Sequence, residues 1–596
     1  MAQRAAQPTY ILGYSGLDGY LSYKNKHIDG LTKYESFVSQ GMDAAAAIIK
    51  DGKIIAACAE ERFTGQKHTG SFPKNAIDAC LKIAGITIKD VSLVAHNFNY
   101  GPYRDLFYLN DYSRGLFDKV LCDQAQEALF KEHYGTDVTD KFRACEHHDT
   151  HGVYAFETSG FDDSLVVVAD GLGEYNSVSV YRGSKTNGLE LLKAYGPASS
   201  LGMLYSAITD YLGFVTNSDE YKIMGLAAYG DASRYKKLFD ETVVMGDKGS
   251  LEIKHFIPQK IESPKDRETY RYFKKWLGTQ IFPERKSDDP VEQQHKDFTA
   301  ALQAKLNEAM THIVGYWQTQ TGLESLCMAG GVALNCVANA HIAKQNIFKN
   351  IYIAPASADD GTSLGAALVL MRQSGIALDP SHYIDMPFYG PEIALNKEDK
   401  IIRDYNLSLE DVSDDELANL ISSAILEGKI VAWAQGGMEF GPRALGHRSI
   451  LADPRKYEMR DRLNTVTKQR ESFRPFAPIV KEEALSEYFD VVEGVTYKHM
   501  LVNVTVKEKC RNSLQAITHV DGTARVQSVS QKDLPVLWKL LDRVEKQISI
   551  PVLLNTSFNL KSMPIVCNDK DALQAFVDSD IDLLVINNTI VRKQEQ

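Results

Sequence analysis

The chain has 596 residues, of which 44% are hydrophobic and 24% are charged, and its formal net charge is −12. This length predicts at least two domains, because a single hydrophobic core stops growing well before it. The acidic charge disfavours nonspecific binding to nucleic acid, and no run of about 18 apolar residues predicts a membrane span. The eight cysteines form no CxxC pair, and the first residues lack the apolar core of a signal peptide. We therefore expect a cytoplasmic protein with reduced thiols and no cysteine zinc site.

The first half of the chain predicts a strand and a hairpin, and then repeats this plan. Residues 10–14 form an apolar strand, and residues 44–49 and 54–59 flank Asp51-Gly52, which is a strong hairpin signal. Residues 164–169 then lead into Asp170-Gly171-Leu172-Gly173-Glu174, and the segments 177–181 and 189–194 form the next hairpin. A repeated strand with an acidic, glycine-containing end and a hairpin is typical of the actin-like, sugar-kinase-like nucleotide-binding fold.

The following elements predict a nucleotide site. Residues 298–317 have helical periodicity, and the strand 325–328 runs into Gly330 and Gly331, which we expect to open a helix that carries Asn335. A strand, a glycine pair and a helix N-terminus are where this fold class holds an adenosine or its phosphates. The strand 351–354 is likewise followed by a helix, at 363–372. We expect residues 375–397 to connect the domains and a helix at 414–427 to begin the C-terminal domain.

A histidine pair predicts a metal site in the first half. His147 and His151 are one helical turn apart, so both imidazoles can reach one ion, although a partly buried helix face would show the same spacing. Two histidines need further ligands. Asp170 and Asp359 are the obvious carboxylates because each follows a buried strand, and Asp360 is the alternative to Asp359.

Glycines and arginines are concentrated in residues 436–455, directly behind the apolar run 430–433. A strand that ends in small residues lets backbone N–H groups approach a phosphate closely. Arginine adds a planar donor fork that matches phosphate or carbamoyl oxygens. The stretch therefore predicts an anion-binding loop, and an ordinary surface turn is the alternative.

The same stretch resembles the signature of O-carbamoyltransferases of the nodulation-protein-U and tobramycin-tailoring type. Segments 468–478, 519–527 and 555–559 resemble further signatures of this family and follow in its order. Together with matches in the first half, the resemblance extends over nearly the whole chain. It implies an α/β protein with an actin-like (ASKHA, Kae-type) carbamoyl-transfer domain at 1–380, a linker at 381–412 and a YrdC-like carbamoyl-activation domain at 413–596.

The resemblance also implies roles for individual residues. In the family, the histidine pair and two strand-end aspartates bind a divalent metal that holds carbamoyl-adenylate, which corresponds here to His147, His151, Asp170 and Asp359. Residues that match those around carbamoyl phosphate and the phosphates of ATP are Arg443, Lys468, Arg474, Arg525 and Ser557, of which one or two could instead be structural. Residues expected to bind the nucleotide are Gly173, Glu220, Lys222, Gly330, Gly331, Asn335, Arg448 and Asn555. Apart from the resemblance, Glu220 and Lys222 would be interpreted as a solvated charge pair.

One departure from the family bears on catalysis. Most members have a histidine before Asp-Ala or Asp-Ser, and relatives use it in catalysis, whereas this chain has Met42 before Asp43 and Ala44. A thioether cannot transfer a proton. Either metal polarisation suffices, or Asp43, His148 or His68 takes the proton, and Asp43 is the first choice.

The resemblance thus implies an ATP-dependent O-carbamoyltransferase. Its cofactors would be ATP with Mg²⁺ and a divalent ion in the N-terminal site, with iron first and Mg²⁺, Mn²⁺ or Zn²⁺ as alternatives. Its partners would be carbamoyl phosphate and a hydroxylated natural product, for which a polyketide, an aminoglycoside or a saxitoxin-type alkaloid would fit, and a homodimer is expected. A sugar-kinase-like phosphotransferase would share the first domain but has no use for the arginine-rich second one. Carbamoyl transfer to tRNA or to a partner protein would need a basic or docking surface.

Overall fold

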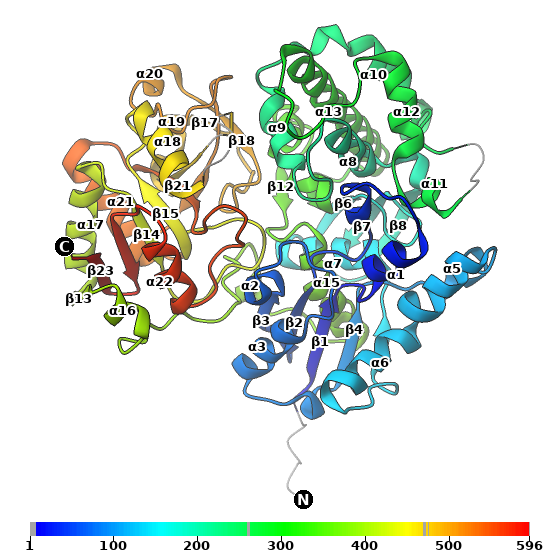
Figure 1. Cartoon of the computed structure of the whole chain (residues 1–596), viewed down its shortest axis with the longest axis horizontal. Helices are drawn as coiled ribbons and strands as arrows, with labels where there is room; N and C mark the ends of the chain where they lie inside the picture. Colours follow the sequence, from blue (N-terminus) through cyan, green and yellow to red (C-terminus); the bar gives the residue numbers. More distant parts are fainter. Residues whose placement is uncertain (1–7, 259–262, 469–472, 475, 595–596) are drawn as a thin grey trace, which may run out of the picture. The chain divides into compact units, whose positions relative to one another are not determined.

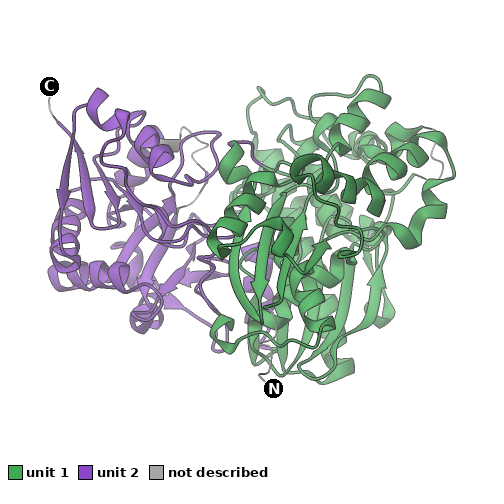
Figure 2. Cartoon of the chain, turned by 90° about the horizontal axis from the view of Figure 1, so that it is seen from below, with its two compact units in different colours: residues 1–64, 68–334, 347–384 green, residues 65–67, 335–346, 385–596 purple. Residues whose placement is uncertain are grey.

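The computed structural model describes residues 8–258, 263–468, 473–474 and 476–594. The chain forms two compact units, coloured separately in Figure 2. The first consists of Met1–Thr64, His68–Leu334 and Ile347–Ile384. The second consists of Gly65–Lys67, Asn335–Asn346 and Asp385–Gln596, so a short segment from the first half of the chain belongs to it.

Two five-stranded sheets in the first unit share one strand order and one pattern of strand directions. Figure 1 labels β1, β2, β3 and β4 of the first sheet and β6, β7, β8 and β12 of the second. In each sheet, the first three strands in chain order pair antiparallel with one another. Two further strands lie on the other side of the first strand and run parallel to it. The first sheet has the order β3-β2-β1-β4-β5, with β1 at Tyr10–Ser15, β2 at Ala45–Lys50, β3 at Lys53–Ala59, β4 at Leu93–His96 and β5 at Phe142–Ala144. The second has the order β8-β7-β6-β11-β12, with β6 at Asp163–Ala169, β7 at Val178–Ser184, β8 at Gly188–Tyr195, β11 at Ser325–Ala329 and β12 at Asn350–Ile353. This duplication confirms the predicted actin-like plan.

Local sequence explains the first hairpin. Asp51 and Gly52 between β2 and β3 have φ angles of 48° and 86°. Two left-handed residues in succession suit the tight turn whose twist matches that of the flanking strands, and Asp-Gly adopts it readily.

Two helices form the middle of the first unit. α15 (Asp359–Gln373) packs on β1, β2 and β4, α7 (His147–Ser159) packs on β6 and β11, and the two helices pack against each other. An added Cβ at Gly365 of α15 would lie 2.0 Å from the carbonyl oxygen of Thr150 in α7, so only glycine permits this approach. The close packing brings the N-terminal turns of the two helices into one region.

Two helix starts differ from the prediction. α15 begins at Asp359 and not near residue 363, because acidic side chains in a first turn interact favourably with the helix dipole. Directly after Gly330, the chain forms a 3₁₀ turn, Gly331–Leu334. The α-helix α14 (Cys336–Lys344) begins only after Asn335. The side chain of Asn335 caps α14 by accepting from the N–H of Ala338.

The second unit is built around an eight-stranded mixed sheet, which agrees with the predicted α/β class. Its order is β13-β23-β22-β14-β15-β21-β16-β20, with β13 at Leu407–Asp411, β14 at Val431–Ala434, β15 at Arg448–Ala452, β16 at Ala477–Lys481, β20 at Gln527–Val529, β21 at Val552–Ser557, β22 at Leu583–Ile586 and β23 at Thr589–Lys593. A smaller sheet joins β17 (Phe489–Asp490), β18 (Asn503–Val506) and β19 (Thr523–Arg525). α17 (Asp414–Leu426) and α21 (Pro535–Ile548) pack on each other, and their apolar side chains share a core with Trp433.

The remaining elements complete the two units. The first unit also contains α1 (Tyr20–His27), α2 (Glu61–Thr64), α3 (Lys74–Ala84), α4 (Arg104–Phe107), α5 (Asp111–Leu116), α6 (Asp123–Tyr134), α8 (Leu201–Tyr211), α9 (Glu220–Ala227), α10 (Lys236–Thr242), α11 (Pro264–Glu268), α12 (Arg271–Gln280), α13 (Gln293–Thr321), β9 (Val243–Met245) and β10 (Leu251–Ile253). The second contains α16 (Lys400–Asp404), α18 (Tyr457–Leu463), α19 (Leu485–Tyr488), α20 (Glu508–Arg511) and α22 (Asp569–Val577). Among the described residues, every helix is too short or too polar to cross a bilayer.

Candidate active site

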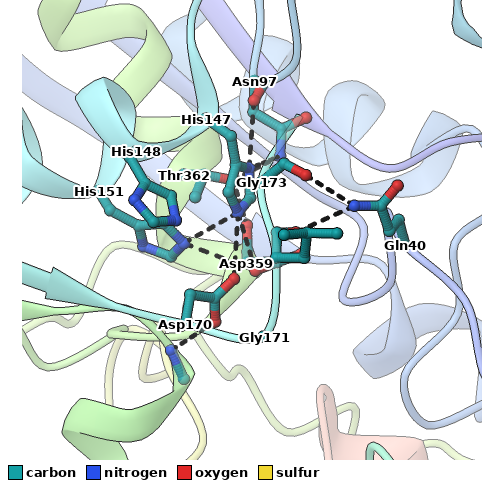
Figure 3. Close-up of polar contacts among 12 residues, drawn as sticks. Gln40, Asn97, His147, His148, His151, Asp170, Gly171, Gly173, Asp359 and Thr362 are labelled. Atoms are coloured by element: carbon teal, nitrogen blue, oxygen red, sulfur yellow. Dashed lines mark hydrogen bonds and ion pairs between the residues drawn. The ribbon is translucent and has the colours of Figure 1, made fainter. Parts of the chain in front are cut away.

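Four polar side chains of the first unit meet where one strand ends and two helices begin (Figure 3). His147 and His151 lie on the first two turns of α7, Asp359 is the first residue of α15, and Asp170 directly follows β6. The structure therefore brings together the four residues that the sequence predicts as metal ligands. We refer to them as the four-ligand group.

The spacing of the four-ligand group fits a single metal ion. The Nε2 atoms of His147 and His151 are 3.2 Å apart. Oδ1 of Asp359 lies 3.5 Å from both of these nitrogens, and Oδ2 of Asp170 lies 3.5 Å from Nε2 of His147. Ligand atoms that surround one ion tetrahedrally at about 2.1 Å are about 3.4 Å from each other. The donor atoms thus already converge on one point.

Neighbouring groups hold these side chains in place. Nδ1 of His147 is 3.3 Å from the carbonyl oxygen of Asn97, so Nδ1–H donates to it and Nε2 faces the other ligands. The amide of Asn97 in turn donates to the hydroxyl of Thr362, at 2.8 Å. Oδ1 of Asp170 accepts from the N–H of Gly331, at 2.8 Å, which leaves Oδ2 for the metal position. Gly331 thus contacts a predicted metal ligand, in addition to its own predicted role in nucleotide binding.

The charges of the group are mutually dependent. Burial lowers the pKa of His147, but Asp359 and then Asp170 outweigh this effect and raise it above its usual range. Burial raises the pKa of Asp170, and His147 and His151 more than reverse this effect. The carboxylates are therefore ionised, and protons compete with a cation for the imidazole nitrogens.

The loop after Asp170 closes over the N-terminus of α7. Glu174 accepts from the N–H groups of Asn99, at 2.7 Å, and His147, at 3.0 Å. The carbonyl of Gly173 accepts from Nε2 of Gln40, at 2.7 Å, and a Cβ at Gly173 would lie 3.1 Å from the ring of His148. Sequence reasoning missed Asn97 and Glu174. Asn97 could have been found, because it follows β4 as Asp170 follows β6.

Asp43 lies in a second group of the first unit. Its Oδ1 is 2.7 Å from Nδ1 of His68, and Glu61 offers a carboxylate oxygen within 4.8 Å of both. Asp43 and His68 both have a φ of 54°, which is uncommon for residues other than glycine. Asp360 is not part of the four-ligand group, and burial followed by the charge of Asp43 raises its pKa to about 8.

Glu220 and Lys222 have partners in α8 and in the residues just before α9. Glu220 accepts from the hydroxyl of Ser206, at 2.7 Å, and from the N–H of Asn217, at 2.8 Å. Lys222 pairs with Asp219 at 3.1 Å. Their expected contacts with a nucleotide, like that of Gly330, stay predictions.

In the second unit, the glycine and arginine loop between β14 and β15 is held by a buried carboxylate. Oε1 of Glu439 accepts from the N–H groups of Leu445, His447 and Arg448, at 2.8, 2.9 and 3.0 Å. Three such bonds to one oxygen fix the backbone on both sides of Gly446. The conformation of the loop around Arg443 therefore depends on Glu439.

Arg448 fixes the same loop from within. Its side chain is fully buried, and its guanidinium donates to the carbonyls of Gln435, Gly436, His447, Pro391 and Cys567. These contacts give Arg448 a structural role. Its expected contact with the nucleotide stays a prediction.

Three of the predicted arginines share one neighbourhood in the second unit. The thiol of Cys336 has its pKa raised by burial, while Arg525 and Arg443 act in the opposite direction. Burial lowers the pKa of Arg525, and Arg474 lowers it further. Arg443 and Arg525 thus lie near Cys336 at the start of α14, and Arg474 lies near Arg525. We call these three residues the arginine group. Sequence reasoning missed Cys336, although it directly follows Asn335.

The other predicted residues of the second unit lie on or near the central sheet. Asn555 of β21 is buried and donates to the carbonyl of Ala444, at 3.2 Å, beside Arg443. Ser557 ends the same strand and donates to Oδ1 of Asn559. Lys468 ends the helical segment Asn464–Lys468, and its side chain lies outside the described part of the chain.

Comparison with known proteins decides the family. Residues 38–368 match the family model described as carbamoyltransferase N-terminus, and residues 422–593 match that described as carbamoyltransferase C-terminus. The chain belongs to the carbamoyltransferase family. This carbamoyltransferase is 34% identical over 597 residues to the nodulation protein NolNO of Sinorhizobium fredii, which covers 97% of this chain and 82% of the relative. It is 27% identical over 562 residues to a 3'-hydroxymethylcephem-O-carbamoyltransferase of Amycolatopsis lactamdurans, which covers 93% and 98%.

These matches confirm the prediction of an enzyme that transfers carbamoyl groups. Among solved structures, full-length HypF in its phosphate- and nucleotide-bound form matches with a TM-score of 0.30 at 12% identity. This match covers 63% of this chain and 56% of HypF, a likeness too low to bear on the site.

Proposed function

We propose that this carbamoyltransferase activates a carbamoyl group with ATP and transfers it to the hydroxyl of a small natural product. The observation that carries the proposal is that each unit contains its own cluster of candidate catalytic side chains. The first unit holds the four-ligand group, and the second unit holds the arginine group. Membership in the carbamoyltransferase family supports carbamoyl transfer as the reaction in which both groups take part.

Activation takes place in the second unit. Water releases phosphate and carbamate from carbamoyl phosphate, and a carbamate oxygen attacks the α-phosphorus of ATP, so that pyrophosphate leaves and carbamoyl-adenylate forms. Arg443, Arg474, Arg525 and Lys468 reduce the repulsion between these anions and stabilise the charge that develops on the transferring groups. Glu439 and Arg448 fix the conformation of the loop around Arg443 before the substrates bind, so the loop needs little reorganisation during the reaction.

Transfer takes place in the first unit. His147, His151, Asp170 and Asp359 would hold a divalent ion, for which iron is the first choice and Mg²⁺, Mn²⁺ or Zn²⁺ are alternatives. Such an ion would act as a Lewis acid on the carbamoyl carbonyl. The acceptor oxygen forms a bond to the carbamoyl carbon, the bond to AMP breaks, and the hydroxyl proton leaves to a base. Glu174 and Asn97 keep His147 oriented throughout.

Two other functions predict different products. A sugar-kinase-like phosphotransferase would release ADP and would not require carbamoyl phosphate. Transfer to tRNA or a partner protein would give the same nucleotide product, AMP, but on a macromolecular acceptor. A small-molecule acceptor is favoured because a relative that is similar over 93% of this chain is named for a cephem alcohol.

Nucleotide product analysis tests the proposal. The metal-loaded protein is incubated with ATP and a panel of alcohols that includes a 3'-hydroxymethylcephem, with and without carbamoyl phosphate. We expect AMP and pyrophosphate only when carbamoyl phosphate is present, together with a carbamoylated alcohol. ADP formation that is independent of carbamoyl phosphate would contradict the proposal and support the phosphotransferase.

A further inference from the structure

The pair of Asp43 and His68 has the geometry of an acid–base dyad. Oδ1 of Asp43 lies 2.7 Å from Nδ1 of His68, which leaves Nε2 as the nitrogen able to exchange a proton with a ligand. The two side chains are 26% and 30% exposed, so a small molecule can reach them. A carboxylate that holds one imidazole nitrogen fixes the ring orientation and stabilises the imidazolium that forms when the other nitrogen takes a proton.

The backbone around the pair is strained and well supported. Asp43 and His68 both adopt left-handed φ angles of 54°, a conformation that persists in such residues only where the surroundings enforce it. The support is visible, because the N–H of Ala44 donates to the carbonyl of Thr69, at 2.8 Å, and the hydroxyl of Ser15 donates to the carbonyl of Asp43, at 3.2 Å. Strain of this kind is concentrated at functional sites.

Two series of contacts within the first unit connect the pair to the four-ligand group. Gln40 bonds the carbonyl of Gly173 in the loop over α7, and three residues span at most about 11 Å between Gln40 and Asp43. On the other side, Asp360 faces Asp43, while its neighbour Asp359 belongs to the four-ligand group. The first turn of α15 therefore carries one residue of the four-ligand group and, next to it, one residue that interacts with the dyad.

Charged groups from several elements face the dyad. Burial lowers the pKa of His68, but Asp43, Glu61 of α2 and Glu220 of α9 outweigh it and raise this pKa to about 9. Asp43 itself is faced by Asp360 of α15. The imidazolium form is therefore strongly favoured, which makes the neutral ring a strong base that is scarce below pH 9.

We propose that His68, oriented by Asp43, takes the proton from the acceptor hydroxyl during carbamoyl transfer. This inference rests on the proposed function. As the acceptor oxygen attacks the carbamoyl carbon, its O–H bond breaks and the proton moves to Nε2 of His68, while AMP leaves as an anion. The imidazolium pairs with Asp43 and returns its proton to solvent. Asp43 thus acts as a positioning residue, and Met42 has no part in proton transfer.

The test separates the transfer step from activation. Carbamoyl-adenylate is supplied to the metal-loaded full-length protein, and AMP release is measured with methanol as the acceptor probe. We expect His68→Asn to slow this reaction by about 10²- to 10⁴-fold, the usual contribution of a general base. The exposed His133 of α6 provides a matched control, and His133→Asn should leave the rate unchanged. Hydroxylamine attacks without prior loss of a proton, so it should reduce the effect of His68→Asn to less than tenfold.

A second readout does not depend on activity. Protein labelled with ¹³C at histidine Cε1 is titrated by NMR, and the His68 signal is assigned from its absence in His68→Asn. We expect a midpoint at about pH 9 in the wild type and a midpoint at least one unit lower in Asp43→Asn. The transfer rate to methanol should rise about tenfold per pH unit up to this midpoint, because the neutral ring is the active form. In Asp43→Asn the rate should level off at a correspondingly lower pH.

The outcomes distinguish the two proposals. A wild-type protein that releases no AMP from carbamoyl-adenylate with either nucleophile would overturn the proposed function and this inference with it. A wild-type protein that transfers to methanol while His68→Asn matches it within threefold, or a rate that does not change between pH 6 and 9, would overturn only the assignment of His68.

Discussion

Asp359 and Asp360 are adjacent in the chain and have different surroundings. Asp359 lies 3.5 Å from Nε2 of both His147 and His151, and these interactions keep its pKa low despite burial. Asp360 has no such partner among its contacts, and burial followed by Asp43 raises its pKa to about 8. Only Asp359 is thus placed to ligate a cation.

We therefore expect the two conservative variants to differ in bound metal. Asp359→Asn removes a charged ligand and should lower the affinity for a divalent ion by about 10- to 100-fold. Asp360→Asn should lower it by less than threefold. Metal titration followed by elemental analysis of the dialysed proteins measures both. Equal losses in the two variants would place Asp360 in the metal site.

Sequence reasoning indicated which residues come together in the candidate site but could not give side-chain direction. The spacing of His147 and His151 and the strand-end position of Asp170 depend on local periodicity, which sequence carries directly. The choice between Asp359 and Asp360 depends on how α15 is rotated in the tertiary structure. Arg448 shows the same limit, because the sequence did not indicate that its side chain is buried and donates to backbone carbonyls such as that of Gln435.

At the scale of elements, the site depends on how closely α7 and α15 approach each other. The strand, hairpin and helix order of the first unit follows from sequence patterns, but this approach is a tertiary contact between residues far apart in the chain. Gly365 faces Thr150, which lies between the two histidine ligands in α7. An added Cβ would lie 2.0 Å from the Thr150 carbonyl oxygen.

Gly365→Ala should therefore separate the two helices and weaken the metal site without changing any ligand. We expect at least a tenfold loss of metal affinity and a lower melting temperature, since overpacking typically costs about 1–3 kcal/mol. Gly375→Ala, at a position with no atom near the added Cβ, is the control for a glycine replacement in the same region, although its φ of 74° adds some strain. Unchanged metal affinity in Gly365→Ala would show that the helix contact does not determine the site.

The loop between β14 and β15 is the corresponding element of the second unit. Glu439→Gln keeps the size of the side chain but weakens three bonds to backbone N–H groups, because bonds to an ionised carboxylate are roughly twice as strong as neutral ones. We expect the formation of carbamoyl-adenylate to slow by about tenfold or more with the secondary structure intact. Pyrophosphate release measures the rate. Glu439→Asp, which keeps the charge, should retain more of that rate than Glu439→Gln.

At the scale of the whole molecule, the two reactive groups belong to separate compact units. The four-ligand group lies entirely in the first unit and the arginine group entirely in the second. The two half-reactions should therefore be separable by mutation. The predicted domains, 1–380 and 413–596 with a linker at 381–412, stay predictions, and the sequence did not indicate that residues 335–346 group with the second unit.

Arg443→Ala or Arg525→Ala should abolish formation of carbamoyl-adenylate from carbamoyl phosphate and ATP, and both variants should still transfer from supplied carbamoyl-adenylate. His151→Ala should show the reverse behaviour. AMP and pyrophosphate are measured separately for each half-reaction. Loss of both half-reactions in a folded Arg443→Ala protein would refute the division of labour.

The position of α15 in the chain has a consequence for biosynthesis. β1 begins at Tyr10 and α15 at Asp359, yet α15 packs on β1, β2 and β4 of the first sheet. While the chain is being synthesised, this face of the sheet has no partner until the ribosome has completed the strands of the second sheet and then α15 itself. A stalled nascent chain that ends before Asp359 should expose the apolar face and retain a holdase chaperone, and extension past Gln373 should release it.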